Sequence, residues 1–304
     1  CTAVSEESTT EQSLFLHSNN SSNSSQLFCL GGINENGQVS FSGSQFNTTT
    51  NQWKPMPEMT TPKYWFGASV IGKKIYVCGG AADTINNPIE KLNLLEVFDC
   101  EHNTWSELAP MEMKRTEFGM ATLNGQIYVA GGYDDSKPLS SVARYSPSTN
   151  TWAEVKPMNG TRFAHELVTL NDAIYAISGY ETNTVERYSP LIDKWSFVAP
   201  THHNHTWFAA TSHQNKIYVL SPNGFEVFDS QFDTWKELPS LNIGDGSQLV
   251  SINDKLWAIG VSEGENKGKA SKTLYEFSTI NNSWVHLPDM DAPRRLHRAV
   301  VVNL

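Results

Sequence analysis

A tryptophan recurs along the chain, and another aromatic residue stands seven positions before it each time. The residue two places before the tryptophan is always Asn or Asp. The six sets are Phe46/Asn51/Trp53, Phe98/Asn103/Trp105, Tyr145/Asn150/Trp152, Tyr188/Asp193/Trp195, Phe228/Asp233/Trp235 and Phe277/Asn282/Trp284. Successive tryptophans lie 40 to 52 residues apart, which is the length of one four-stranded propeller blade. The chain therefore has to fold as six similar units.

Each unit is made of short strands. In the second unit the run Ile75 to Gly80 is apolar and ends in a glycine pair, a polar loop follows, and the chain resumes as an apolar run at Leu95. Both runs are rich in β-branched and aromatic residues and are bounded by Gly, Asn and Asp, which is typical of strands. The glycine pair indicates backbone that adopts positive φ or lies close to another segment.

The two ends of the chain complement each other. The first unit lacks the innermost strand that the later units have, and residues 298–303 form a lone strand with no unit after it. We predict an all-β fold: a six-bladed β-propeller of four-stranded antiparallel blades, closed by the C-terminal strand entering blade 1, which protects open sheet edges. Residues 26–304 form this propeller, and the polar residues 1–25 are expected to be a flexible lead-in.

Bulk composition narrows the function classes. The formal net charge of −10 disfavours nucleic acid as a partner, and no apolar run is long enough to span a membrane. The four cysteines form no C-x-x-C pair and suit buried thiols in a reducing compartment. We expect a cytoplasmic protein.

Three motifs in fixed order now carry a resemblance. The runs "IYVCGG", "LEVFDCEHNTW" and "PMEMKR" resemble the kelch repeat, and the recurrent "PM" with a following basic residue is similar to the kelch domains of BTB-kelch proteins. The likeness covers residues 26–304. It departs in the fifth repeat, which reads "IYVLSPNG", and in the sixth, which reads "PSLNIGDGSQL" without a basic residue; the loop shape of these two blades is therefore open.

The resemblance implies a function. In such proteins a BTB domain upstream dimerises and binds a cullin scaffold, while the propeller captures a protein substrate for ubiquitination. This chain would be the capture half of a cullin-RING ubiquitin ligase adaptor. It would not be an enzyme, and it would need neither cofactor nor metal.

The resemblance also places the partner-binding residues. Peptides dock on the face formed by the loops after the glycine pair and by the residues after the "PM" motif. Carried over to this sequence, the partner-binding residues are Tyr64, Trp65, Thr116, Glu117, Tyr133, Asp134, Phe163, Tyr180, Glu181, Thr206, Trp207 and Arg295, with Asp83 and Asp135 in the same loops. This aromatic and acidic set favours a peptide segment that is basic and apolar.

Structural explanations compete with several of these assignments. Trp65 and Trp207 could instead wedge between blades. Arg115, Arg162 and Arg294 occupy the basic position of the repeat and are expected to hold the loop rather than a ligand. The run His202 to His205 is interpreted as loop, because one flexible segment does not provide a tetrahedral metal site.

Two other functions share the scaffold, since a fold does not fix a function. One is a cytoskeletal module that binds actin. The other is an enzyme, such as a kelch-fold sugar epimerase or oxidase. Arg, Glu and His converging in the channel with shifted pKa values would favour the enzyme.

Overall fold

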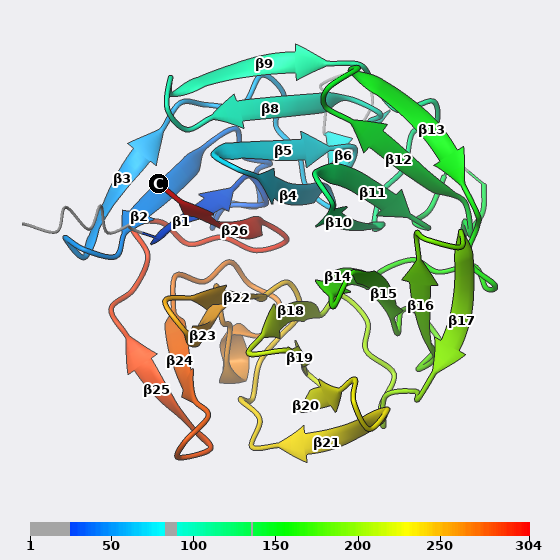
Figure 1. The fold of residues 1–304 in the computed structure, drawn as a ribbon. Coiled ribbons are helices and arrows are strands. Elements are labelled where there is room, and N and C mark those ends of the chain that lie inside the picture. Colours follow the sequence, from blue (N-terminus) through cyan, green and yellow to red (C-terminus); the bar gives the residue numbers. More distant parts are fainter. Residues whose placement is uncertain (1–24, 83–89, 135) are drawn as a thin grey trace, which may run out of the picture.

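The computed structural model describes residues 25–82, 90–134 and 136–304. Residues 1–24 of the predicted lead-in lie outside these ranges, as do Asp83 and Asp135. Six four-stranded antiparallel sheets surround a central channel, as Figure 1 shows. The prediction of six blades is confirmed. In the described ranges, no helix has the length and apolar character needed to cross a membrane.

Every blade runs from an inner strand at the channel to an outer strand at the perimeter. Blade 1 comprises β26 (Arg298–Asn303), β1 (Ser25–Leu30), β2 (Gly43–Asn47) and β3 (Gln52–Met56). Blade 2 comprises β4 (Gly67–Ile71), β5 (Lys74–Cys78), β8 (Leu95–Asp99) and β9 (Thr104–Leu108). Blade 3 comprises β10 (Gly119–Leu123), β11 (Gln126–Ala130), β12 (Val142–Ser146) and β13 (Thr151–Val155).

The second half repeats this plan. Blade 4 comprises β14 (Glu166–Leu170), β15 (Ala173–Ile177), β16 (Val185–Ser189) and β17 (Lys194–Val198). Blade 5 comprises β18 (Ala209–His213), β19 (Lys216–Ser221), β20 (Gly224–Asp229) and β21 (Thr234–Leu238). Blade 6 comprises β22 (Gln248–Ile252), β23 (Lys255–Ile259), β24 (Leu274–Ser278) and β25 (Ser283–Leu287). The loops add a two-stranded sheet of β6 (Ala81–Ala82) and β7 (Glu90–Lys91), and the 3-10 helix η1 (Gly264–Asn266).

The last strand closes the ring. β26 pairs antiparallel with β1, placing Val300 opposite Phe28 and Val301 opposite Leu27. Figure 1 shows the two ends of the described chain meeting in this blade. The predicted closure is therefore confirmed: β26 covers β1 and takes the innermost place in blade 1, as β4 does in blade 2.

The recurring tryptophan motif joins neighbouring blades. In blade 4, Trp195 Nε1 donates to the Lys156 carbonyl at 2.9 Å, while Asp193 Oδ1 accepts from the Lys156 N–H at 3.1 Å. Both backbone groups of one residue in blade 3 are thus held by blade 4. The same double contact holds Ala109 through Asn150 and Trp152, and Ala199 through Asp233 and Trp235. We call this arrangement the clasp.

The spacing within the motif follows from the clasp. The aromatic residue and the tryptophan are cross-strand neighbours, such as Tyr188 and Trp195, with ring centroids 5.0 Å apart in this blade. The Asn or Asp between them has a positive φ at all six positions, 47° at Asp193, a conformation that Asn and Asp tolerate better than most residues. The turn residue and the clasp residue are therefore the same.

Apolar side chains fill the space between blades. The cluster between blades 2 and 3, for example, contains Tyr76 and Val97 from one blade and Phe118 and Tyr145 from the next. The glycine pairs allow this close approach, because a Cβ at Gly79 of blade 2 would lie 2.9 Å from the carbonyl oxygen of Arg115, in the segment that leads into blade 3. Six small inter-blade cores thus take the place of one large core.

The clasp predicts a graded loss of stability in blade 4. Trp195→Phe keeps an aromatic ring but leaves the Lys156 carbonyl without its donor, so we expect a loss of about 1–3 kcal/mol in the free energy of unfolding. Trp195→Ala also removes the ring and should lose about 3–5 kcal/mol. Urea denaturation followed by circular dichroism measures both.

Phe197 is the matched control on the same strand. Its side chain is 59% exposed, so Phe197→Ala should change the free energy of unfolding by less than about 0.5 kcal/mol. Equal losses for Trp195→Phe and Phe197→Ala would show that the indole hydrogen bond does not hold the blades together.

Candidate binding site on the loop face

Six equivalent residues encircle one end of the channel. Each lies two positions before the first residue of an inner strand, and each has a positive φ between 47° and 85°. The six residues are Trp65, Glu117, Ala164, Trp207, Gly246 and Leu296. Backbone hydrogen bonds link successive members, from Glu117 N to Trp65 O at 3.1 Å, Ala164 N to Glu117 O at 2.8 Å, Trp207 N to Ala164 O at 3.3 Å and Gly246 N to Trp207 O at 3.4 Å. We call this ring the collar.

The collar surrounds a cavity of about 50 Å³, which we call the throat. Trp65, Glu117 and Trp207 line it, and the Trp207 Nε1 donates to Glu117 Oε2 at 2.7 Å. Trp207 is 38% exposed. The wedging role considered for the two tryptophans belongs to the following residues, since Phe66 and Phe208 are the ones buried in the inter-blade clusters.

Aromatic side chains continue outward from the collar over blades 3 and 4. Phe163 stacks on Tyr180 at 4.9 Å between ring centroids and meets Tyr133 edge-on at 5.5 Å. Lys91 Nζ lies 4.8 Å from the centroid of the Tyr133 ring. Tyr180 is 47% exposed and Glu181 beside it is also exposed. These residues form a continuous aromatic row, which we call the rim.

Other predicted binding residues lie differently from expectation. Tyr64 and Thr116 are buried beneath the face, because their backbones bridge to Ala81 and Tyr133. Their side chains are therefore not on the surface, and the sequence assignment needs this correction. Thr206 is partly buried, and its Oγ1 donates to the Gly179 carbonyl at 3.4 Å.

Asp134 and Arg295 already have partners within the chain. Asp134 Oδ1 accepts from the N–H groups of Ser136 and Lys137 at 2.7 and 2.8 Å, and these bonds lower the pKa of Asp134. Arg295 donates to the Gly268 carbonyl and lies on the side of the face opposite the rim, between blades 6 and 1. Both residues shape loops of the face.

The two atypical repeats now have defined loops. In blade 5, where the glycine pair is lost, β19 and β20 are joined by Pro222 and Asn223 alone. Asn223 Nδ2 in this turn donates to the Asn204 carbonyl at 2.6 Å. In blade 6, the apolar Ile243 is buried and bridges to Glu263.

The basic position of the repeat is buried and structural. Arg162 donates to the carbonyls of Ser178 and Thr184 at 3.0 and 2.7 Å and pairs with Glu186 at 3.0 Å. Arg115 and Arg294 bond to backbone carbonyls in the same manner. The expectation that these arginines hold the loops is consistent with every one of these contacts.

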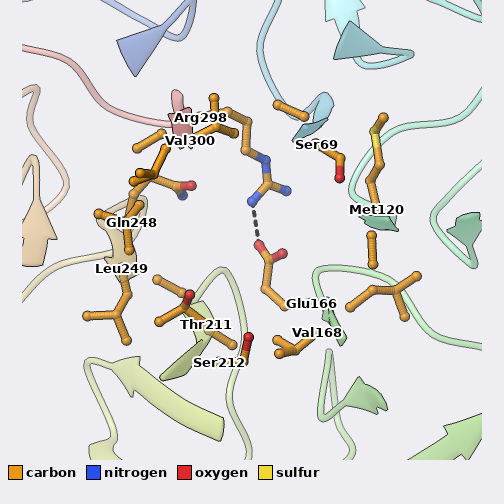
Figure 2. Close-up of a pocket in the computed structure, with 18 of the residues that line it drawn as sticks. Ser69, Met120, Glu166, Val168, Thr211, Ser212, Gln248, Leu249, Arg298 and Val300 are labelled. Carbon is orange, nitrogen blue, oxygen red and sulfur yellow. Dashed lines mark hydrogen bonds and ion pairs between the residues drawn. The ribbon is translucent and has the colours of Figure 1, made fainter. Parts of the chain in front are cut away.

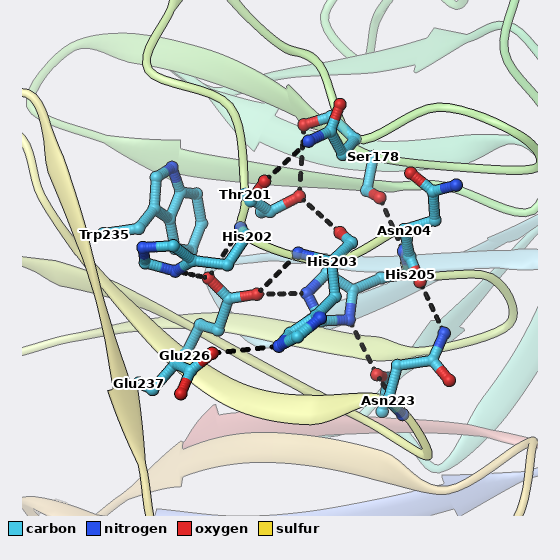
Figure 3. Close-up of polar contacts among 12 residues, drawn as sticks. Ser178, Thr201, His202, His203, Asn204, His205, Asn223, Glu226, Trp235 and Glu237 are labelled. Atoms are coloured by element: carbon cyan, nitrogen blue, oxygen red, sulfur yellow. Dashed lines mark hydrogen bonds and ion pairs between the residues drawn. The ribbon is translucent and has the colours of Figure 1, made fainter.

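In blade 5 a histidine occupies that position. The buried His205 bonds to Glu226 Oε1 at 2.8 Å and to Ser221 Oγ at 2.6 Å, and His202 Nδ1 bonds to Glu226 Oε2 at 2.6 Å (Figure 3). Burial raises the pKa of Glu226, but the bonds from His205 and His202 outweigh it and hold the pKa at about 2. The histidine run lies in a loop, as expected, and hydrogen bonds to Glu226 hold this loop in place.

An ion pair crosses the channel below the collar. Arg298 of blade 1 pairs with Glu166 of blade 4, and Figure 2 shows the two side chains reaching toward each other from opposite sides. Sequence reasoning missed both residues. The first residue of each inner strand would have revealed them, because Glu166, Gln248 and Arg298 stand where the other blades have Gly67, Gly119 and Ala209.

The ion pair separates two spaces. Above it lies the throat, and on its other side the channel has a cavity of about 370 Å³, lined partly by hydroxyl groups such as those of Ser69 and Thr211. His165 directly precedes Glu166 in the sequence, and His297 directly precedes Arg298. Burial and the nearby arginines lower the pKa of each histidine to about 3, so both are neutral at pH 7. Within the described ranges, no group of three or more His, Cys, Asp or Glu is arranged to hold a metal ion.

Comparisons with known proteins agree on one family. A family model described as the KLHDC2/KLHL20/DRC7 Kelch-repeats domain matches residues 16–224. Kelch-like protein 35 of Mus musculus is 27% identical over 91% of this chain and 48% of its own length. Kelch-like protein 23 of Pongo abelii is 34% identical over 34% of this chain and 17% of its own. The chain thus spans half or less of these relatives.

A solved structure shares the fold. "Structure of YjhT" superposes with a TM-score of 0.72 over 86% of this chain and 97% of that one, at 15% sequence identity. At this identity the likeness concerns the arrangement of the blades and not the residues of the face or channel.

The Glu226 network predicts a pH dependence of stability. The pKa of Glu226 is about 2 in the folded protein, against an ordinary value of 4.5. Its contribution to the free energy of unfolding is therefore complete above about pH 4.5 and is lost as the pH falls toward 2. Glu226→Gln cannot titrate. We expect its urea midpoint to fall less than that of the wild type between about pH 5 and pH 3.

Glu237→Gln is the control. Glu237 pairs with His203 in the same network, but its side chain is largely exposed, so this variant should keep the wild-type pH dependence. If the Glu226 and Glu237 variants gave parallel curves, the buried carboxylate would not be the group responsible.

Proposed function

The chain belongs to the Kelch-repeats domain family whose model it matches over residues 16–224, and from this premise we propose that it captures substrate proteins for ubiquitination. It is a Kelch β-propeller protein-interaction domain. The capture role would make it the recognition half of a BTB-kelch adaptor of a cullin-RING ligase. A BTB domain upstream would then supply the homodimer and the cullin contact.

The observation that carries the proposal is the rim together with Trp207. Tyr133, Phe163 and Tyr180 form a row of rings on the loop face, and the partly exposed Trp207 lines the throat. Aromatic residues of this kind dominate the energy of protein interfaces, because they bury a large area at little conformational cost. The face is therefore suited to a peptide segment.

Charge indicates which segment would bind. Glu117 at the throat and the exposed Glu181 beside the rim are acidic, so a basic and apolar segment fits better than an acidic one. Asp134 adds to the negative charge of this face, although its carboxylate already accepts a hydrogen bond from the Ser136 N–H of its own loop. Arg295 lies on the far side of the face, where it would contact a different part of the partner.

Binding without catalysis accords with the channel. Glu166 is occupied by Arg298, and the His165 and His297 rings are buried, with no hydrogen-bond partner for any ring nitrogen among the described residues. An enzyme remains the competing function, because Arg, Glu and His do lie near one another here. We further propose a cytoplasmic location, which the free thiols Cys29, Cys78 and Cys100 support.

The proposal predicts which changes abolish capture. The protein is tagged at its own locus and recovered from its cells for mass spectrometry. Tyr180→Ala removes an exposed ring of the rim, and Glu117→Lys reverses the charge at the throat. Each should reduce recovery of the captured proteins about tenfold or more, while a cullin is still recovered through the rest of the protein.

Phe232→Ala serves as the surface control. Phe232 is 68% exposed and lies at the end of β20 remote from the loop face, so its loss should leave capture intact. Recovery of actin in place of a cullin would instead support the cytoskeletal function. Stronger capture by Glu117→Lys would refute the assignment of a basic partner.

A further inference from the structure

We propose that the throat receives the ammonium group of one lysine side chain of the captured protein. Trp65 and Trp207 would contact its stem, and Glu117 would bind its charge. This inference rests on the proposed function, since the lysine belongs to the substrate segment. It goes further by naming one residue type and the place where it binds.

Shape limits what the throat can hold. Its volume of about 50 Å³ exceeds the roughly 10–15 Å³ that one water needs but is too small for an aromatic ring or a folded segment. It therefore suits the end of a single long side chain. The small collar residues Ala164 and Gly246 leave the entrance open between the two tryptophans, which come from opposite positions of the six-membered collar.

Aromatic faces at the entrance favour a cation. Trp is the strongest cation–π partner among the side chains, and pairs of aromatic rings with a carboxylate recur where proteins bind ammonium groups. The Trp207 indole is fixed by its bond to Glu117 at 2.7 Å. Trp65 lines the same cavity from the opposite position of the collar.

The charge around the throat is negative by one unit. Glu117 and Glu166 are the two acids that line it and Arg298 is the one permanent cation, while His165 and His297 are neutral at pH 7 because of burial. Arg298 is paired with Glu166. Glu117 has the Trp207 N–H and no ion-pair partner in the described ranges.

Burial makes Glu117 receptive to a cation. Burial raises the pKa of Glu117, and only the Trp207 hydrogen bond and the more distant charge of Lys91 oppose this. An ammonium group in the throat would supply the missing counter-charge. The ion pair between Arg298 and Glu166 forms the floor, so the side chain would stop at Glu117 and not pass down the channel.

The test compares two peptides that differ only in the ammonium group. N-acetyl-Gly-Lys-Gly-amide and the same peptide with norleucine are titrated into the ¹⁵N-labelled protein, and the indole N–H signals of Trp65 and Trp207 are followed by NMR. These signals are assigned with Trp65→Phe and Trp207→Phe. We expect the lysine peptide to shift both signals, and the norleucine peptide to shift them at least tenfold more weakly.

Glu117→Gln and Glu107→Gln form the matched pair of variants. Gln at position 117 still accepts the Trp207 hydrogen bond but carries no charge, so binding of the lysine peptide should weaken about tenfold or more. Glu107 is exposed on β9, and its variant should bind as the wild type does.

Each outcome separates this inference from the proposed function. No shift with the lysine peptide up to its solubility limit, or equal shifts with norleucine, would overturn the lysine assignment. Loss of capture in Tyr180→Ala would still support capture on the loop face in that case. Because the two peptides are compared on the wild-type protein, variants are needed only to assign the two indole signals and not to decide between the peptides.

Discussion

The clasp between blades is the interaction on which the rest of the structure depends. An indole N–H and an Asn or Asp oxygen of one blade hold the carbonyl and the N–H of a single residue in the blade before it. These backbone groups lie at the end of an outer strand, where no further strand could pair with them. Figure 1 shows the outer strands following one another head to tail around the perimeter. The full clasp joins them at Ala109, Lys156 and Ala199, and an indole bond alone does so at Pro57 and Pro239. Two hydrogen bonds to one residue fix both the distance between neighbouring blades and the angle between them.

Two further contacts keep the ring from opening. β26 completes blade 1 through six paired positions, and Arg298 on that strand reaches across the channel to Glu166 of blade 4. Backbone hydrogen bonds also link the collar residues, all with positive φ, from Trp65 in blade 2 through to Gly246 in blade 6. Such conformations are uncommon for residues that carry a Cβ, and here the closed ring maintains them. The loop face is therefore presented by a rigid support, which favours recognition with little loss of conformational freedom.

Sequence was sufficient for the fold because its signal is repeated. The tryptophan spacing, the glycine pairs and the lone last strand each predict the same closed ring, and the buried role of Arg162 follows from its place in the repeat. The site was less predictable. The bond from Trp207 to Glu117 joins residues 90 positions apart, and the buried Tyr64 is bridged to Ala81, in the loop that follows β5 of the same blade. A comparison of the six repeats could have found Glu166, Gln248 and Arg298, because these polar residues begin inner strands where the other blades have Gly or Ala.

The protein combines a rigid ring with a face that differs from blade to blade. We expect the ring to behave as one unit, so that the throat and the rim keep their geometry without a partner. Native-state hydrogen exchange of the slowest amides in the second strand of every blade tests this expectation most directly. A common free energy of opening for all six blades is the predicted result. A graded series, with blade 1 or blade 6 opening well before blades 3 and 4, would contradict it.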